Sequence, residues 1–445
     1  MKKETFAHLV FASLGFRRLI VAVCAALLSI FIPVPGVHAQ TFSAIYNFAG
    51  GELGAIPYAG VTMDLQGNLY GVTYAGGRGS CSSLGFTGCG TVFKLTKRNS
   101  QWLYSELYVF AGGRDGAGPL ERVIMGPNGS LYGTTSAGGG GVCASLLGLP
   151  GCGTVFDLQP PLSVCEVVSC PWRETQLYVF QGSANGGSDG AAPDSEVVFD
   201  QVGNLYGVTY EGGSSSLGTV YELSPSGGAW TKDTIWNFTG GIDQSHPEST
   251  LVFDAEGNLY GTVFGNPGNG AVFELAPTGS GWAESTLYSF QNASDGEWPI
   301  SGVIFDERGN LYGASANDGS GAGGTAFQLT PLNQGWEFNL LYSFTGPVNY
   351  CGSEADLVID AAGNLYGTTY CDGQFQMGSV FELSPSNGGW TYRTLHDFQG
   401  GTSDGAYPVS NLVLDDMGNL YGTASQGGAG TNCTAGCGVV FKITP

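Results

Sequence analysis

Gly-Asn-Leu-Tyr-Gly, at residues 203–207, occurs seven times in this 445-residue chain, with Ser replacing Asn in one copy. A glycine-rich gap and a segment such as Thr-Val-Tyr-Glu-Leu, at residues 219–223, follow it. The copies begin at Gly67, Gly129, Gly203, Gly257, Gly309, Gly363 and Gly418, at spacings of 52 to 74 residues. A repeat of this length with several short strands per copy is typical of a β-propeller. We therefore expect an all-β, seven-bladed β-propeller.

Each copy contains four predicted strands, A to D in chain order, and none has a helical hydrophobic period. Strand A is a short apolar run ending in Asp, as at 251–254, and strand B contains the Asn-Leu-Tyr-Gly motif. Strand C is Thr-Val-Phe-Glu-Leu or a variant, and strand D runs from a Trp to a Phe eight residues later, as from Trp282 to Phe290. The blades are therefore predicted to be four-stranded.

The last blade is predicted to close with a strand from the other end of the chain. Six copies of strand D follow their strands C, whereas the chain stops at Pro445 directly after a strand C. The seventh copy, Ile-Tyr-Asn-Phe at 45–48, lies near the N-terminus. We expect it to pair with strands between 409 and 443, which closes the ring and leaves no free blade at the seam.

The predicted turn between strands A and B reads Asp-x-x-Gly-Asn in most copies, as at 360–364. Its Asp is suited to an Asx-turn and its Gly to a positive φ angle. The same residues resemble part of a calcium loop, but the Asp-x-Asp-x-Asp-Gly spacing of that motif is absent. We interpret these turns as structural.

Residues 1–39 have the pattern of an export signal. Basic residues, ending with the pair Arg17 and Arg18, precede an apolar run at 19–32 and a small-residue site at 37–39. The alternative is a membrane anchor, but this run is short for a span of roughly 20 residues. We expect the general secretory route, with a twin-arginine route as the other possibility. The mature chain, 40–445, is then one propeller domain, secreted, periplasmic or at the cell surface.

The mature chain is strongly acidic. The whole chain has 15 Lys and Arg against 37 Asp and Glu; loss of 1–39 removes four basic residues and Glu4, leaving a formal charge near −25. Nucleic acid is therefore excluded as an expected partner, because phosphate binding needs a basic surface. The acidity favours solubility, cation binding or a cationic target, and we expect a monomer without a transmembrane span.

Ten cysteines follow the predicted signal, and they fall into near-neighbour pairs. An even number of cysteines in an exported chain indicates disulfides. Metal ligation is the alternative, but the mature chain has only His246 and His396 and no Cys-x-x-Cys pair. The predicted disulfide cysteines are Cys81 and Cys89, Cys143 and Cys152, Cys165 and Cys170, Cys351 and Cys371, and Cys433 and Cys437.

Alternating strand directions place the D–A and B–C loops on one face, which we call the loop face. Three of the cysteine pairs fall in B–C loops, and long, disulfide-linked loops on a rigid scaffold are common sites of function.

The D–A loops carry an Asp followed by Pro. One interpretation is a turn that starts strand A; the other is a set of Ca²⁺ ligands, since Ca²⁺ prefers oxygen. The candidate metal ligands are Asp115, Asp189, Asp243, Asp295 and Asp404.

Aromatic residues next to proline in the same loops are candidate ligand-binding residues: Tyr58, Trp298 and Tyr407. Their rings could stack on sugars or on a partner's side chains. Packing against the neighbouring blade is the alternative. The repeated Tyr of the pentapeptide and the Trp of strand D recur at fixed register, which predicts a place between the blades.

The repeated Gly-Asn-Leu-Tyr-Gly, Thr-Val-Phe-Glu-Leu and Leu-Tyr-Ser-Phe (287–290 and 341–344) segments resemble the GloVer tandem repeat of exported bacterial proteins. The resemblance covers essentially the whole mature chain. It implies a secreted or surface-displayed propeller-like array, and it carries over no activity and no catalytic residues. Members often have a C-terminal sorting anchor; this chain ends at Pro445, so we expect release.

The expected function is a non-catalytic binding or scaffold module that recognises an extracellular or envelope ligand, a glycan or a protein, through the loop face. The alternative is a calcium-assisted or carboxylate-based hydrolase or lyase acting on polysaccharide, since propellers also host such enzymes. The chain has no Gly-x-Ser-x-Gly elbow and no metal-type His cluster. We assign no catalytic residue, and Ca²⁺ is the one cofactor considered.

Overall fold

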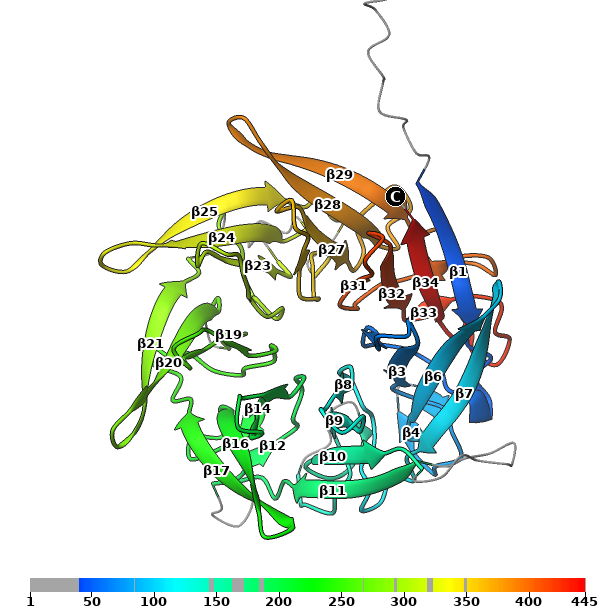
Figure 1. The fold of residues 1–445 in the computed structure, drawn as a ribbon, viewed down its shortest axis with the longest axis horizontal. Coiled ribbons are helices and arrows are strands. Elements are labelled where there is room, and N and C mark those ends of the chain that lie inside the picture. The colour runs from blue at the N-terminus through cyan, green and yellow to red at the C-terminus, as the bar shows by residue number, and fades with distance from the viewer. Residues whose placement is uncertain are drawn as a thin grey trace, which may run out of the picture. The chain divides into compact units, whose positions relative to one another are not determined.

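The computed structural model describes residues 40–83, 85–143, 148–161, 172–183, 188–266, 268–291, 294–317, 323–347 and 350–444. Residues Phe42–Thr444 form one compact unit. In it, seven four-stranded antiparallel sheets surround a central axis as the blades of a propeller (Figure 1). The predicted fold class is confirmed. The predicted export signal lies outside the described residues, and within them no helix has the length and hydropathy needed to span a membrane.

The seven blades follow one another along the chain, and each runs from an inner strand A to an outer strand D. Blades 1 to 4 are β2 (Thr62–Met63), β3 (Leu69–Thr73), β6 (Thr91–Arg98) and β7 (Gln101–Val109); β8 (Ile124–Met125), β9 (Leu131–Thr135), β10 (Thr154–Gln159) and β11 (Arg173–Val179); β13 (Val198–Phe199), β14 (Leu205–Thr209), β16 (Thr219–Ser226) and β17 (Ala229–Asn237); and β18 (Val252–Phe253), β19 (Leu259–Val263), β20 (Ala271–Thr278) and β21 (Gly281–Ser289). Blades 5 to 7 are β22 (Ile304–Phe305), β23 (Leu311–Ser315), β24 (Thr325–Pro331) and β25 (Trp336–Ser343); β26 (Val358–Ile359), β27 (Leu365–Thr369), β28 (Ser379–Ser386) and β29 (Gly389–Asp397); and β31 (Val413–Leu414), β32 (Leu420–Ala424), β34 (Val439–Thr444) and β1 (Thr41–Asn47). The loops add η1 (Gly51–Leu53), β4 (Ser82–Ser83), β5 (Phe86–Thr87), β12 (Gly190–Ala191), β15 (Glu211–Gly212), β30 (Gly405–Ala406) and β33 (Gln426–Gly427).

Blade 7 combines the two ends of the propeller, as the sequence predicted. Its strand order is β31-β32-β34-β1, so β1 is its outermost strand, and Figure 1 shows β1 beside β34. Phe48, just after β1, is fully buried, and its amide donates to the carbonyl of Gly438 at 3.0 Å. The same segment contacts blade 1, since Tyr46 stacks on Tyr104 with ring centroids 4.8 Å apart. Closure therefore joins the ends of the ring by both hydrogen bonds and packing.

The pentapeptide is repeated because each of its residues meets a separate structural need, as blade 4 illustrates. Gly257 has a φ of 89°, which favours glycine. The next residue, Asn258, donates from its amide and side chain to Asp254, and the hydroxyl of Tyr260 donates to the same carboxylate at 3.0 Å. Gly261 lies over the ring of Phe273, where an added Cβ would be 2.8 Å from Cζ. The predicted Asx-turn is confirmed, because the amide of the residue two after Asp254 also donates to it.

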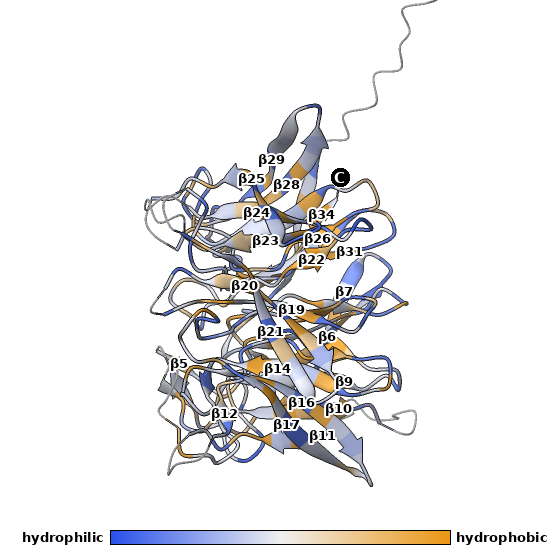
Figure 2. Ribbon diagram, turned by 90° about the vertical axis from the view of Figure 1, so that its left-hand side faces the viewer, coloured by the Kyte–Doolittle hydropathy of each residue, from blue (hydrophilic) through white to orange (hydrophobic). Residues whose placement is uncertain are grey.

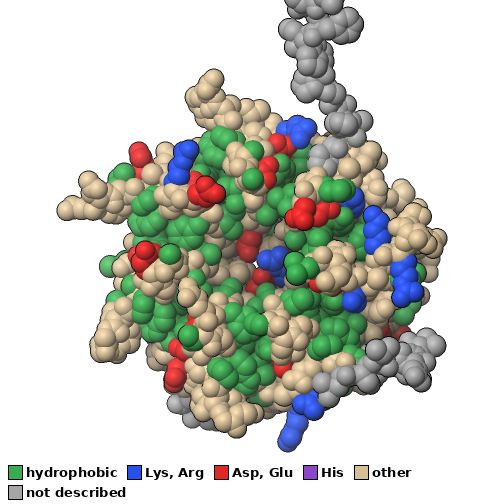
Figure 3. Space-filling model, in the orientation of Figure 1, with side chains coloured by type: hydrophobic (Ala, Val, Ile, Leu, Met, Phe, Trp, Pro, Cys, Tyr) green, Lys and Arg blue, Asp and Glu red, His purple; other side chains and the backbone are tan. Residues whose placement is uncertain are grey.

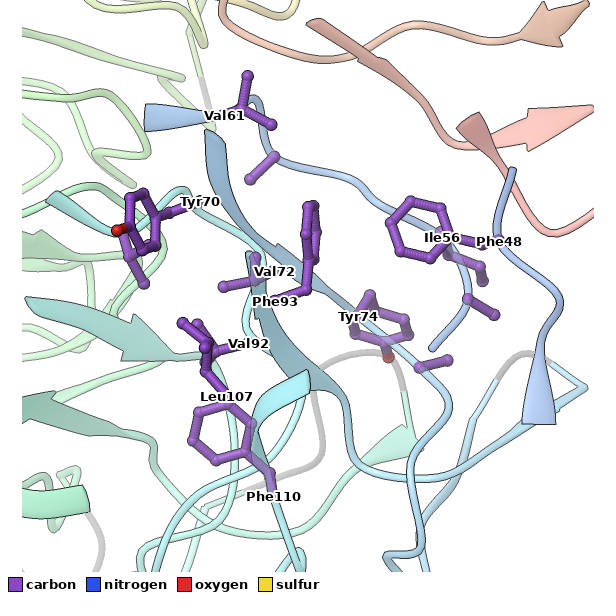
Figure 4. Packing of buried hydrophobic residues seen from close by; sticks show 14 of the residues in the cluster. Phe48, Ile56, Val61, Tyr70, Val72, Tyr74, Val92, Phe93, Leu107 and Phe110 are labelled. Carbon is purple, nitrogen blue, oxygen red and sulfur yellow. The ribbon is translucent and has the colours of Figure 1, made fainter. Parts of the chain in front are cut away.

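The repeated tyrosines and tryptophans pack between blades, as predicted. Tyr260 of blade 4 meets Phe305 and Trp336 of blade 5, with centroids 5.0 and 6.4 Å away. At the junction of blades 7, 1 and 2, one buried cluster includes Phe48, Phe93 and Phe110 (Figure 4). Seen from the side, hydrophobic stretches concentrate on strands such as β6, β9 and β10 (Figure 2). The core is thus a series of interfaces around the ring.

The innermost strands are shorter than predicted. Strand A was expected over four residues, 251–254, but only Val252 and Phe253 pair in the ladder, with Tyr260 and Leu259. The blades converge at the axis, so the residues before this pair line the central channel, and Asp254 belongs to the turn.

A proline from six of the seven D–A loops packs on the glycine that opens strand C of the preceding blade. An added Cβ on Gly270 would lie 2.2 Å from Cδ of Pro299, and the φ of this glycine is 92°. Equivalent contacts occur in six of the seven blades, and in blade 6 Gly352 takes the place of the proline next to Gly324. This contact fixes where each D–A loop turns toward the axis.

Four of the five predicted disulfides are present, and the Cys165–Cys170 pair lies outside the described residues. The pairs are Cys81–Cys89, Cys143–Cys152, Cys351–Cys371 and Cys433–Cys437. Cys351–Cys371 links a D–A loop to the end of β27 in blade 6. Local covalent links of this kind hold the loop face against the strands.

Candidate functional site

The central channel is lined by residues that follow the D–A loop prolines. The first residue after each proline, or after Ser353 in blade 6, faces one cavity of about 430 Å³ at the loop face. We call these seven residues the upper ring: Tyr58, Leu120, Asp194, Glu248, Ile300, Glu354 and Val409. The residues two positions further along we call the waist ring: Gly60, Arg122, Glu196, Thr250, Gly302, Asp356 and Asn411. The cavity above the waist ring we call the cup.

Serines between these two rings hold the inner segments of blades 3, 4, 5 and 7 to strand B. The hydroxyl of Ser249 accepts from the amide of Thr262 at 2.8 Å, and Ser410 does the same with Thr423 at 2.8 Å. Successive residues of an extended chain point to opposite sides. Anchoring the intermediate residue to strand B therefore directs its two neighbours toward the axis.

The cup contains four carboxylates without a protein partner. Glu121, Asp194, Glu248 and Glu354 form no hydrogen bond or ion pair within the part of the chain that the structure describes. All four line the cavity and are half-buried. Figure 3 views the opposite face, that of the A–B turns, and shows charged side chains at the centre of the ring, surrounded by hydrophobic ones. Such carboxyl groups accept hydrogen bonds when ionised and can donate one when protonated.

The pKa values of these carboxyl groups are raised. Burial raises the pKa of Asp194 to about 7 and that of Glu354 to about 7. For Glu248, burial and then the charges of Asp194 and Glu354 raise the pKa well above its ordinary value. The pKa of Glu121 is also raised well above its ordinary value, by burial first and then by neighbouring carboxylates. Near neutral pH the cup therefore presents both protonated and ionised carboxyl groups.

A polar layer at the waist ring closes the bottom of the cup. Arg122 forms an ion pair with Glu196, whose side chain is 2% exposed. The side-chain amide of Asn411 donates to Glu196 at 2.9 Å and to Asp356 at 3.1 Å. Asp356 also accepts from the amide of Gly302. This layer draws on blades 2, 3, 5, 6 and 7.

Aromatic residues surround the mouth of the cup. Tyr58, Tyr74 and Tyr370 line the cavity itself. Trp298 stacks between Phe264 and Tyr350, with centroids 5.5 and 4.5 Å away. Tyr407 packs against Tyr370 at 5.2 Å, and His246 against Tyr210 at 4.6 Å. We call these nine residues the aromatic rim: Tyr58, Tyr74, Tyr210, His246, Phe264, Trp298, Tyr350, Tyr370 and Tyr407.

The three predicted ligand-binding aromatics all belong to this rim, but they have different positions. Tyr58 is in the upper ring and lines the cup, with burial and nearby carboxylates such as Glu354 raising its pKa. Trp298 and Tyr407 precede the D–A prolines and have φ angles of 55°. Their rings pack on neighbours, as the packing alternative predicts, and ligand contact stays a prediction.

The predicted metal ligands do not gather at one place. Each carboxylate stays in its own D–A loop: Asp295 accepts from the hydroxyl of Tyr288 at 2.7 Å and from an amide at 2.9 Å, and Asp404 accepts from His396 at 3.0 Å. Asp189 also pairs with Lys232 at 2.6 Å, while Asp115 and Asp243 accept from their own loops. Among the described residues, no three His, Cys, Asp or Glu side chains are grouped to hold a metal ion. Calcium binding by these loops stays a prediction.

Sequence reasoning missed the charged residues of both channel rings. The signal was present: between the D–A proline and strand A the seven copies read Tyr-Ala-Gly, Leu-Glu-Arg, Asp-Ser-Glu, Glu-Ser-Thr, Ile-Ser-Gly, Glu-Ala-Asp and Val-Ser-Asn. These three positions vary in charge between otherwise similar segments. A functional site that belongs to the whole ring is expected to break the repeat in this way.

Comparisons with known proteins give a family and a distant fold likeness. No curated protein matches the chain. A crystal structure of a protein of unknown function from Dyadobacter fermentans is 10% identical, with a TM-score of 0.46, over 92% of this chain and 99% of that one. A putative oxidoreductase (glucose dehydrogenase) from Thermus thermophilus is 15% identical, with a TM-score of 0.39, over 91% and 99%. Likenesses this distant carry no functional argument.

The family result agrees with the resemblance seen in the repeated segments. The family described as the Gloeobacter/Verrucomicrobia repeat matches residues 153–302 and, overlapping them, 264–445. Those two matches run from strand C of blade 2, β10, to strand C of blade 7, β34, with the strands and turns derived above. This chain belongs to the Gloeobacter/Verrucomicrobia repeat family.

Proposed function

We propose that the protein is an exported recognition module that binds a glycan in the cup, at the centre of the loop face. A propeller of this repeat family fits a binding or scaffold role. The observation that carries the glycan proposal is the combination of the aromatic rim with four carboxyl groups that have no partner among the described residues. Carboxyl groups bind hydroxyls by strong hydrogen bonds, and aromatic faces cover the apolar faces of sugar rings.

The size and chemistry of the cup support a small polar ligand. Its volume of about 430 Å³ lies in the range of small-molecule sites, which extends from about 300 to 1,000 Å³. Its wall includes the apolar side chains Leu120, Ile300 and Val409 as well as the carboxyl groups. Apolar walls with a few convergent polar groups are the usual composition of a ligand pocket. The four described disulfides support a location in an oxidising compartment, as export implies.

A glycan array tests the proposal. We expect specific binding by the purified protein, weakened at least tenfold by Glu354→Gln and by Trp298→Ala. The matched control is Glu307→Gln, an exposed glutamate in an A–B turn, on the opposite face, which should bind as the wild type does. Binding that is unchanged in Glu354→Gln would contradict a site in the cup. A protein that binds none of the glycans would direct attention to protein partners.

A second candidate function is carboxyl-based cleavage of a polysaccharide. The observation that favours it is the pair Asp194 and Glu354, both with pKa values raised to about 7 in one cavity. A carboxyl group that titrates near the working pH serves well as a general acid or base. Release of reducing ends from polysaccharides by the wild type, lost in Asp194→Asn without loss of binding, would support this function. No release from any polysaccharide that binds would contradict it.

The calcium prediction has a separate test. The D–A loop aspartates would gain a stabilising ion, so Ca²⁺ should raise the melting temperature and a chelator should lower it. A melting temperature that is the same in both conditions would remove calcium from these loops. Glycan binding in the presence of chelator would at the same time show whether recognition needs the ion.

A further inference from the structure

The channel consists of two cavities separated by the waist ring. The cup, of about 430 Å³, opens among the D–A and B–C loops, and a second cavity of about 410 Å³ is lined by the strands A. Thr250, Asp356 and Asn411 line both cavities, so they form the partition between them. Because strands A run from the loop face toward the A–B turns, the second cavity lies on the side of those turns.

Side chains of the waist ring reach across the axis. Asn411 follows the D–A loop of blade 7, whereas Glu196 precedes strand A of blade 3. Two blades, 1 and 2, lie between them on the short way round a seven-bladed ring, which is as far apart as two blades can be. The hydrogen bond of 2.9 Å between Asn411 and Glu196 therefore crosses the middle of the channel. Ion pairing of Glu196 with Arg122 extends the same layer to blade 2.

The partition is held closed by charge and by close backbone packing. Moving both Asn411 and Arg122 away would leave the carboxylate of Glu196, with 2% of its side chain exposed, buried without partners, which is strongly unfavourable. The backbone approaches closely as well: a Cβ on Gly60 would lie 2.2 Å from the carbonyl oxygen of Asn411. Gly302 is packed in a similar way, because an added Cβ on it would lie 2.8 Å from the carbonyl oxygen of Thr250.

The cavity beyond the partition has a different chemistry. Besides the partition residues and Arg122, which pairs with Glu196, its walls are aliphatic, as with Val252, Ile304, Val358 and Val413. A sugar that entered this cavity would lose hydrogen bonds to water without replacing them. The second cavity therefore offers no continuation of the binding site in the cup.

We propose, on the basis of the proposed glycan function, that the cup binds the end of a glycan chain and that no chain threads the ring. The cup opens at the loop face, and Asp356 and Asn411 line its polar floor. Asn411 also donates to Glu196, which pairs with Arg122 in the same layer. The terminal unit enters, and the rest of the chain leaves past the aromatic rim. An internal sugar is linked to the chain on both sides, so it fits in the cup only if both flanking parts of the chain leave through the opening at the loop face.

Titrations with three sets of oligosaccharides of the same linkage test this proposal: linear chains, the same chains with either end chemically blocked, and cyclic forms. We expect binding of the linear chains, at least tenfold weaker binding when one of the two ends is blocked, and no binding of the cyclic forms. Equal affinity for linear and cyclic forms would overturn chain-end binding and leave glycan recognition intact. If no oligosaccharide or array glycan binds, both proposals fail.

A floor variant adds a second readout. Asn411→Ala removes the contact that crosses the axis, and we expect it to reduce the discrimination against blocked ends. The control is Asn258→Ala, which removes a side-chain amide bonded to Asp254 in an A–B turn and should keep the discrimination. Unchanged discrimination in a folded Asn411→Ala protein would contradict the role of the floor. Should this variant fail to fold, the wild-type titrations decide the question alone.

Discussion

The A–B turns and the upper ring of the channel are built in opposite ways, although both belong to every blade. Six of the seven A–B turns carry the same Asp and Asn, and the carboxylate accepts the same hydrogen bonds, as at Asp64, Asp254 and Asp415. The upper ring has seven residues of six types, including three acids and three aliphatic side chains. Repetition therefore marks what the architecture needs, and variation marks the surface that a ligand would meet.

The largest expected loss of stability follows from a substitution in the core between the blades. Phe273→Ala should lower the free energy of unfolding by about 3–5 kcal/mol, because the ring is 1% exposed and truncation leaves a cavity beside Phe238 and Gly261. Denaturant unfolding measures this change. The control Tyr350→Ala, an aromatic residue of the rim that is 44% exposed, should cost less than about 1 kcal/mol. Equal losses in the two variants would break the contrast between body and rim.

The next effect concerns the repeated turn. Asp254→Ala removes an acceptor of bonds from the amides of Glu256 and Asn258, the side chain of Asn258 and the hydroxyl of Tyr260. We expect a loss of about 2 kcal/mol, because the donors are left without their partner. The equivalent change Asp360→Ala should cost about the same, since its contacts are equivalent. A large difference between the two, by thermal or denaturant unfolding, would show that the repeat is not energetically regular.

Replacing Asp by Asn should raise the stability in the upper ring and lower it in an A–B turn near pH 7.5. The pKa of Asp194 rises from 3.8 to about 7 on folding because of burial. The folded protein then holds this proton more tightly than the unfolded chain, so stability falls as the pH rises from about 4 to about 7. Asp194→Asn should match the wild type near pH 4 and be about 1–2 kcal/mol more stable near pH 7.5.

The matched variant for Asp194→Asn is Asp306→Asn, in the A–B turn of blade 5. Burial by itself would raise the pKa of the Asp306 carboxyl group, but hydrogen bonds from Asn310, Arg308 and Tyr312 together lower it. This carboxylate therefore stabilises the fold above its unfolded pKa, and the contribution is lost as the pH falls. Asp306→Asn should be about 1 kcal/mol less stable than the wild type near pH 7.5, with a difference that shrinks in acid. Unfolding curves across this pH range in which both variants shift the same way would refute the distinction.

The smallest effect is expected in the apolar wall of the cup. Ile300→Val should change the free energy of unfolding by about 0.5 kcal/mol or less, because this half-buried side chain faces the cavity. Val303→Ala, three residues along in the same segment, should cost about 2 kcal/mol, because Val303 is 3% exposed in the core between blades. Denaturant midpoints of the two variants give the comparison. A larger loss for Ile300→Val would mean that the upper ring is part of the core.

Much of the fold could be predicted because its signals are local and are repeated seven times. The turn chemistry of Asp254 and Gly257 acts within a few residues, and a missing strand D after 439–443 matched an extra one at 45–48. Near-neighbour cysteines were paired correctly for the same reason in the four described cases. The short length of strand A was not predictable, because it depends on where the blades converge.

The candidate site could be predicted only in part. The loop aromatics Tyr58, Trp298 and Tyr407 were selected by composition, and the structure places them around the cup. Asp295 and its equivalents were selected by the same reasoning, and the structure gives each of them partners in its own loop. Composition cannot distinguish a carboxylate that is already hydrogen-bonded from one that faces a cavity.

The sequence by itself determined the number of blades, the order of their strands, the turns and the strand that closes the ring, because these depend on contacts within one repeat or at its ends. Only the tertiary structure decided the channel. Glu196 and Asn411 are 215 residues apart, and nothing in either segment indicates that they meet. Their contact exists because ring closure brings the start of every strand A to one axis, where seven short segments make a single surface.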